Sequence, residues 1–118
     1  MIYRLAIVFL AFLVSPTEGR DLLGGVSQGD LLRNWALSRC IAKAFGPGKV
    51  KDDANISASA YLEEIRARPE VYEEIDSLVT QALARTASGS VKGNYNTKKC
   101  IDLYSSKALR QLIEKYVQ

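Results

Sequence analysis

The chain has 118 residues, a net charge of +3, no histidine and only two cysteines. This length allows one domain at most. Without histidine and with two cysteines, the composition excludes zinc sites built on histidine or on four cysteines, and it excludes serine–histidine and cysteine–histidine catalysis. The charges are interspersed and form no basic face with an aromatic ladder, so nothing indicates nucleic-acid binding.

The first 19 residues, MIYRLAIVFLAFLVSPTEG, predict a cleaved secretory signal peptide. Arg4 supplies the charged start, residues 5–14 form the apolar centre, and Thr17 and Gly19 are the small residues before a cut after Gly19. Ten apolar residues are too few to cross a bilayer of about 30 Å, so a retained anchor is the less favoured alternative. The mature domain is then residues 20–118.

Export determines how the two cysteines are interpreted. In an oxidising compartment, two cysteines with no thiol left over most simply form one disulfide, here Cys40–Cys100. Such a bridge closes a loop of about 60 residues, which the chain-entropy model values at about 4 kcal/mol. A catalytic or redox cysteine is the alternative, but it calls for a nearby histidine or a CxxC pair, and the sequence has neither.

The first half of the mature chain predicts two helices. GDLLRNWALSRCIAKAF, residues 29–45, reads as the first helix, with Asp30 as its N-cap and GPG as its stop. Its apolar side is expected to hold Leu32, Trp35, Ala36, Cys40, Ile41, Ala44 and Phe45. VKDDANIS, residues 50–57, is polar and predicts a connection to a second helix over residues 58–68. Core residues expected from this region are Ile56, Tyr61, Leu62 and Ile65.

The third predicted helix has the clearest period in the chain. Pro69 pre-sets its first turn, and it extends over residues 69–85. Its apolar positions recur at helical spacing at Val71, Ile75, Leu78, Val79, Ala82 and Leu83. TASGSVKGNYN, residues 86–96, then predicts a loop that is longer than a minimal helix connection needs. This loop is either a plain linker or a projecting binding loop.

Two short helices complete the chain. Asn96 or Thr97 is expected to cap the first, and Ser105 or Ser106 the second. Their expected core residues are Cys100, Ile101, Leu103, Tyr104, Leu109, Leu112, Ile113 and Tyr116. The predicted fold class is all-α, a compact bundle of about five helices with the first and fourth joined by the disulfide.

The remaining candidates for chemistry are paired carboxylates. They stand at Asp52–Asp53, Glu63–Glu64 and Glu73–Glu74. Adjacent helical side chains point about 100° apart, so solvated helix faces explain these pairs better than convergence on a substrate. Carboxylates from separate helices could still form a glycosidase-like pair, which leaves a small envelope hydrolase as a rival hypothesis. We nevertheless expect no enzyme, no cofactor and no metal.

Four segments together resemble a known family. NWALSRCIAKAF, DANISASAYLE, VYEEIDSLV and KCIDLYSSKALRQLIEKY are similar to the immunity proteins of type VI secretion amidase effectors, over residues 31–117. The resemblance implies a helical, periplasmic protein with a disulfide between the two cysteine blocks, commonly a homodimer, and free of the membrane after signal removal. It also implies a partner, a cognate cysteine–histidine amidase that cuts peptidoglycan, whose active-site groove the immunity protein occludes.

The resemblance places the effector-binding loop just ahead of the second cysteine block. Carried onto this sequence, its residues are Ser88, Gly89, Ser90, Val91, Lys92, Gly93, Asn94 and Tyr95. Small residues let a backbone approach a narrow groove, and Gly89 and Gly93 can take φ values that other residues cannot. The alternative function is a periplasmic helical adaptor or a structural subunit of an envelope assembly.

Overall fold

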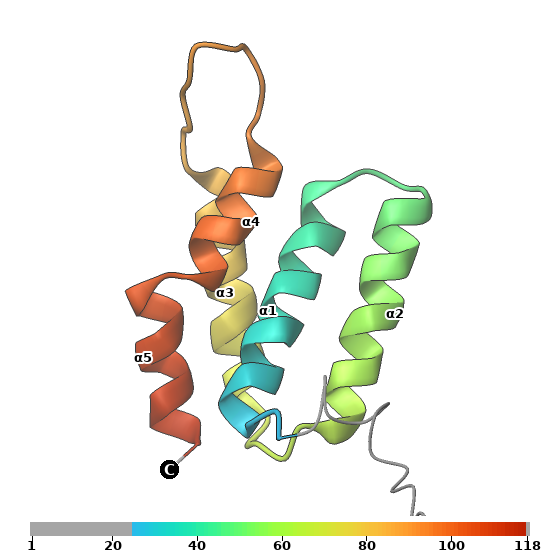
Figure 1. Ribbon diagram of the computed structural model, residues 1–118, viewed down its shortest axis with the longest axis vertical. Coiled ribbons are helices and arrows are strands. Elements are labelled where there is room, and N and C mark those ends of the chain that lie inside the picture. The colour runs from blue at the N-terminus through green and yellow to red at the C-terminus, as the bar shows by residue number, and fades with distance from the viewer. Residues whose placement is uncertain (1–24, 118) are drawn as a thin grey trace, which may run out of the picture.

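The computed structural model describes residues 25–117, and within this range it consists of five α-helices and connecting segments (Figure 1). The helices are α1 (Gln28–Ala44), α2 (Lys49–Glu64), α3 (Glu70–Ala84), α4 (Asn96–Tyr104) and α5 (Lys107–Tyr116). The predicted all-α fold is confirmed. The predicted signal peptide lies outside the described residues. No helix in the described range has the length and apolar character needed to span a membrane.

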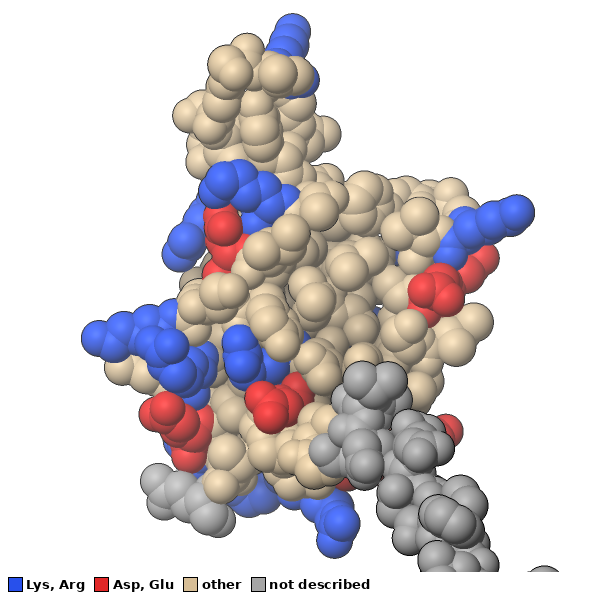
Figure 2. All heavy atoms as spheres, in the orientation of Figure 1, with Lys and Arg blue, Asp and Glu red and all other residues tan. Residues whose placement is uncertain are grey.

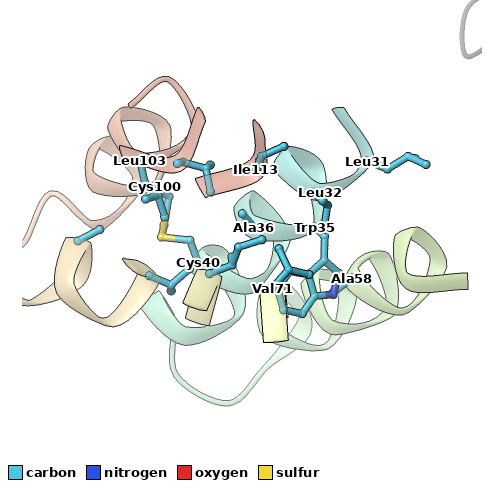
Figure 3. Packing of buried hydrophobic residues seen from close by; sticks show 14 of the residues in the cluster. Leu31, Leu32, Trp35, Ala36, Cys40, Ala58, Val71, Cys100, Leu103 and Ile113 are labelled. Carbon is cyan, nitrogen blue, oxygen red and sulfur yellow. A yellow bond between two sulfur atoms is a disulfide. The ribbon is translucent and has the colours of Figure 1, made fainter. Parts of the chain in front are cut away.

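Helix α1 is the centre of the bundle. It packs against all four other helices, whereas α2 packs closely against α1 alone (Figure 1). Trp35 of α1 is buried and meets the Tyr72 ring edge-on, with 4.9 Å between ring centroids. The core around α1 contains Leu32, Ala36, Val71, Ile75, Val79, Leu109 and Ile113. Figure 3 labels four of these, Leu32, Ala36, Val71 and Ile113. Burial of this apolar surface is the main stabilising term for the fold.

Both ends of α1 differ from the prediction. The helix begins at Gln28 because Ser27, rather than Asp30, is its N-cap. The Ser27 hydroxyl accepts from the Asp30 amide at 3.0 Å and donates to the Asp30 carboxylate at 3.0 Å, so the two residues cap the helix together. At the other end, Phe45 lies just beyond the last helical residue and is 36% exposed, outside the expected core.

Helix α2 is longer than predicted. Residues 50–57, expected to be a connection, are helical. Asp52 lies in the first turn, where the helix dipole favours an acidic side chain. The buried residues of α2 are Ala54 and Ala58, so the helix packs against α1 through small side chains. This narrow contact leaves Ile56 (69%) and Leu62 (45%) exposed, and their predicted place in the core is wrong.

The periodic pattern of α3 is confirmed by burial. Val71, Ile75, Val79 and Ala82 are buried, and Leu78 and Leu83 pack at the edge of the core. In the last helix, Leu109 and Ile113 are buried in the same way.

The start of α5 is capped by Ser106. Its hydroxyl accepts a hydrogen bond from the Leu109 amide at 3.1 Å, which decides between the two serines proposed from the sequence. In α4, by contrast, Ile101 is 54% exposed, because Cys100 and Leu103 take the buried side of this short helix. The prediction that Ile101 belongs to the core is wrong.

The predicted disulfide is present. Cys40 of α1 and Cys100 of α4 are bonded, with 5.6 Å between their Cα atoms, and both side chains are buried (Figure 3). The bridge spans 60 positions of sequence and fixes α4 to the central helix. A sulfur that is bonded and buried is not available as a nucleophile, so the alternative of a catalytic cysteine is excluded.

Candidate protein-binding loop

The segment between α3 and α4 projects beyond the ends of the helices (Figure 1). Residues 88–94 are all exposed, and Val91 near the middle is 73% exposed. Lys92 is the only charged residue between Thr86 and Tyr95, and the projecting end is correspondingly almost free of charge in Figure 2. All eight residues predicted for effector binding therefore lie on one protrusion, with only Tyr95 partly buried.

Tyr95 organises the inside of the loop. Its backbone is left-handed (φ 57°, ψ 32°), and its hydroxyl donates a hydrogen bond back to the Val91 carbonyl. Gly89 lies against the end of this ring, since a Cβ added to Gly89 would stand 2.5 Å from the Tyr95 hydroxyl oxygen. Gly89 therefore occupies a position that has no room for a side chain beside the Tyr95 ring.

The reason given from the sequence for the two glycines is not supported. Neither Gly89 nor Gly93 has a left-handed φ, and a Cβ at Gly93 would meet no heavy atom within 4 Å. In this loop it is Tyr95 that takes the left-handed conformation, at a cost on the order of 1 kcal/mol for a residue with a Cβ. Its hydroxyl contact helps to hold that conformation.

The base of the loop is tied to two helices that are distant in sequence. The Asn96 side-chain amide donates to the Ala44 carbonyl at the end of α1, over 2.9 Å. The Lys99 ammonium donates to the Leu83 carbonyl near the end of α3, over 3.2 Å, where the helix dipole favours a cation. With the disulfide at Cys100, these contacts hold the start of α4 in place.

The predicted cap of α4 is wrong. The helix begins at Asn96, and the preceding residue, Tyr95, makes no side-chain cap hydrogen bond. An asparagine or threonine before a helix commonly caps it. Here the Asn96 side-chain amide instead donates its hydrogen bond to the carbonyl at the end of α1. Sequence patterns did not reveal this role or that of Lys99, because each partner is a backbone carbonyl far away in the chain.

Two hollows flank the loop base. One lies between α3, α4 and the start of α5, has a volume of about 360 Å³, and includes the charged residues Arg85, Lys98 and Asp102. The other lies between the end of α1, the end of the loop and α4, and has a volume of about 780 Å³. Phe45, Tyr95 and Ile101 give this second hollow a mainly apolar surface.

Some carboxylates of the described residues form ion pairs, and Asp76 and Glu74 pair with basic residues of other helices. Asp76 lies 3.2 Å from the Arg39 guanidinium and 3.6 Å from the Lys43 ammonium. Glu74 lies 3.2 Å from Lys115, and hydrogen bonding with the Tyr116 hydroxyl and then Lys115 lowers the pKa of its carboxyl. A lowered pKa keeps this carboxyl ionised, which suits a surface ion pair and not a general acid.

A metal site has no support among residues 25–117. No group of three or more histidine, cysteine, aspartate or glutamate side chains is close enough there to hold a metal ion.

The molecule is a disulfide-bonded helical scaffold with a small-residue loop displayed at one end. This arrangement suits binding to another protein.

Comparison with known proteins gives the family. The model of the family Tai4, described as "Type VI secretion system (T6SS), amidase immunity protein", matches residues 30–113. The chain therefore belongs to the Tai4 family of type VI secretion system amidase immunity proteins, as its sequence segments predicted. Members of this family are immunity proteins and not enzymes. No protein with a curated description matches the chain significantly.

Solved structures agree with this assignment. A chain in the effector–immunity system Tae4/Tai4 from Salmonella typhimurium is 41% identical, with a TM-score of 0.72 over 78% of this chain and 91% of that one. A chain in the Tae4–Tai4 complex from Enterobacter cloacae is 32% identical, with a TM-score of 0.69 over 77% and 93%. A Serratia marcescens structure of type VI-secreted toxins and self-resistance proteins, at 22% identity and a TM-score of 0.70 over 94% and 89%, supports the fold alone.

Proposed function

We propose that the chain binds a cognate type VI amidase effector and blocks its active-site cleft with residues 88–95. The projecting loop is the observation that carries this proposal: seven consecutive residues are exposed on a base that is fixed by a disulfide and two side-chain hydrogen bonds. The similar chains from Salmonella and Enterobacter come from structures of an effector with its immunity protein, which supports an amidase as the partner.

Inhibition by such a loop requires geometry and no catalytic group. A cleft that is filled by a protein loop excludes its substrate. A loop that is already ordered when free loses little conformational entropy on binding, and this raises affinity. Ser88, Gly89 and Ser90 are small enough for the backbone to approach a narrow groove, while Tyr95 holds the returning side of the loop.

The proposed place of action is the periplasm. Peptidoglycan lies there, and residues 1–19 are expected to direct export and to be removed, which leaves residues 20–118 as the active domain. The buried Cys40–Cys100 bond supports this, because disulfides persist in oxidising compartments. We also propose that the chain is a homodimer, as the family resemblance implies. The mass of the purified mature chain in solution tests that part.

The test is protection of cells. The cognate amidase, directed to the periplasm, is produced together with the exported chain, and survival is measured. We expect wild type to rescue growth, and Ser90→Trp to fail because a large side chain no longer enters the cleft. Ala60→Trp, at an exposed position of α2, is the matched control and should rescue like wild type. No rescue by wild type, or equal rescue by Ser90→Trp, contradicts the proposal.

A further inference from the structure

The apolar hollow beside the loop base is a feature that the loop mechanism does not use. The end of α1 forms one side of it through Phe45 and Gly46, and α4 forms the other through Ile101. Phe45 is 36% exposed and Ile101 is 54% exposed, so both expose apolar surface that the core does not need. Gly46 also lines the hollow, and a Cβ added there would meet no heavy atom within 4 Å, so this side of the hollow is open.

The hollow is continuous with the binding loop. Asn94 and Tyr95 belong to the predicted effector-binding set and also line the hollow. In Figure 1 the end of α1 and the start of α4 lie at the same end of the molecule as the projecting loop, just below it. A partner whose cleft receives the loop tip must therefore pass close to Phe45 and Ile101.

The size of a stable interface requires more contact than the loop offers. Specific protein complexes bury about 800 Å² on each partner, from roughly 20–30 residues a side. Residues 88–95 are eight residues, so most of the contact must come from surfaces beside the loop base. Of the two hollows there, one carries the charges of Arg85, Lys98 and Asp102, and the other is mainly apolar.

The charge pattern indicates what the apolar hollow would accept. Lys98 also reaches its lining, but the Lys98 ammonium is paired with the Asp102 carboxylate of the next turn at 2.6 Å. Figure 2 shows an uncharged surface between the projecting loop and the α1–α2 connection. Burying such a surface against an apolar group of a partner is favourable, because both apolar surfaces leave the water. Burying an unpaired charge there would be unfavourable.

We infer that this hollow is a second contact site for the amidase and receives an apolar side chain from the lip of the amidase cleft. The inference rests on the proposed function and adds Phe45 and Ile101 to the binding surface. The loop then blocks the cleft, while the hollow supplies the desolvated apolar centre that protein interfaces commonly have beside their polar parts.

The test compares two exposed apolar residues, Ile101 in the hollow and Ile56 on α2. Ile101→Asp places a charge in the hollow, and Ile56→Asp places the same charge on α2, where Ile56 is even more exposed at 69%. Both full mature proteins are compared with wild type for circular dichroism, melting temperature, mass in solution and Kd for the cognate amidase, measured by calorimetry. Ile101→Leu is included because it keeps an apolar side chain in the hollow.

We expect Ile101→Asp to raise Kd at least about tenfold, as for a residue at the centre of an interface, with melting and mass unchanged. Ile101→Leu and Ile56→Asp should stay within about twofold of wild type. Equal binding by Ile101→Asp overturns the inference and leaves the loop mechanism standing. So does a loss of self-association with unchanged Kd, which would make the hollow a contact between copies. Failure of wild type itself to bind contradicts the proposed function.

Discussion

Replacement of both cysteines by alanine should remove about half of the stability of this domain. The Cys40–Cys100 bond closes a loop of 60 residues, and the chain-entropy model assigns about 4 kcal/mol to such a closure. A domain of about 100 residues has a free energy of unfolding on the order of 5–10 kcal/mol. With a urea dependence of about 1–2 kcal/mol per molar, the unfolding midpoint is expected to fall by about 2–4 M.

The assay is equilibrium unfolding in urea, followed by Trp35 fluorescence and by circular dichroism. Wild type treated with reductant is the control, and it should lose about as much stability as the Cys40→Ala/Cys100→Ala variant, because both lack the cross-link. The variant should also inhibit the amidase less well, since α4 and the loop base are no longer fixed to α1. A midpoint that moves by less than about 0.5 M would refute the assigned role of the bridge.

Three further predictions concern single side chains. Asn96→Ala removes the hydrogen bond to the end of α1 and should lower the free energy of unfolding by about 1 kcal/mol in urea unfolding, with a clear loss of amidase affinity; unchanged affinity would show that this contact does not position the loop. Ser106→Ala should lower the free energy of unfolding by about 1 kcal/mol, and Ser105→Ala should leave it nearly unchanged; equal losses would contradict the assignment of the α5 cap. Because the pKa of the Glu74 carboxyl is lowered in the fold, its contribution to stability is present above its ordinary pKa of 4.5 and is lost as pH falls through the lowered value. Tyr116→Phe removes the largest cause, so the Glu74 pKa should rise in an NMR titration, and no rise would refute that cause.

The fold could be predicted where its contacts leave a periodic apolar pattern. Helix α3 was found because Val71, Ile75 and Val79 return to the same face, and that face is the buried one. The disulfide followed from export and from the count of two cysteines. The start of α2 was missed for the opposite reason. It meets α1 through Ala54 and Ala58, and two alanines in a polar segment give no apolar stripe to detect.

The sequence predicted where the candidate binding loop lies, but not the contacts that hold it in place. Two glycines and two serines in an aperiodic stretch indicated a loop, and the family resemblance gave that loop a role. The contacts that fix it run from Asn96 and Lys99 to backbone carbonyls of other helices, and a carbonyl carries no mark in the sequence. The exposure of Ile101 could not be predicted either. Helix α4 is short, and its few apolar residues do not form a repeat that shows which of them faces outward.

The most direct test of the proposed mechanism is titration of the cognate amidase with the purified mature chain during peptidoglycan hydrolysis. We expect the release of cleaved peptide stems to fall to background near one equivalent of wild type and of Ala60→Trp. The Ser90→Trp protein should leave hydrolysis largely intact at the same concentration. Full inhibition by Ser90→Trp, or continued hydrolysis with excess wild type, would contradict a mechanism in which this loop fills the active-site cleft.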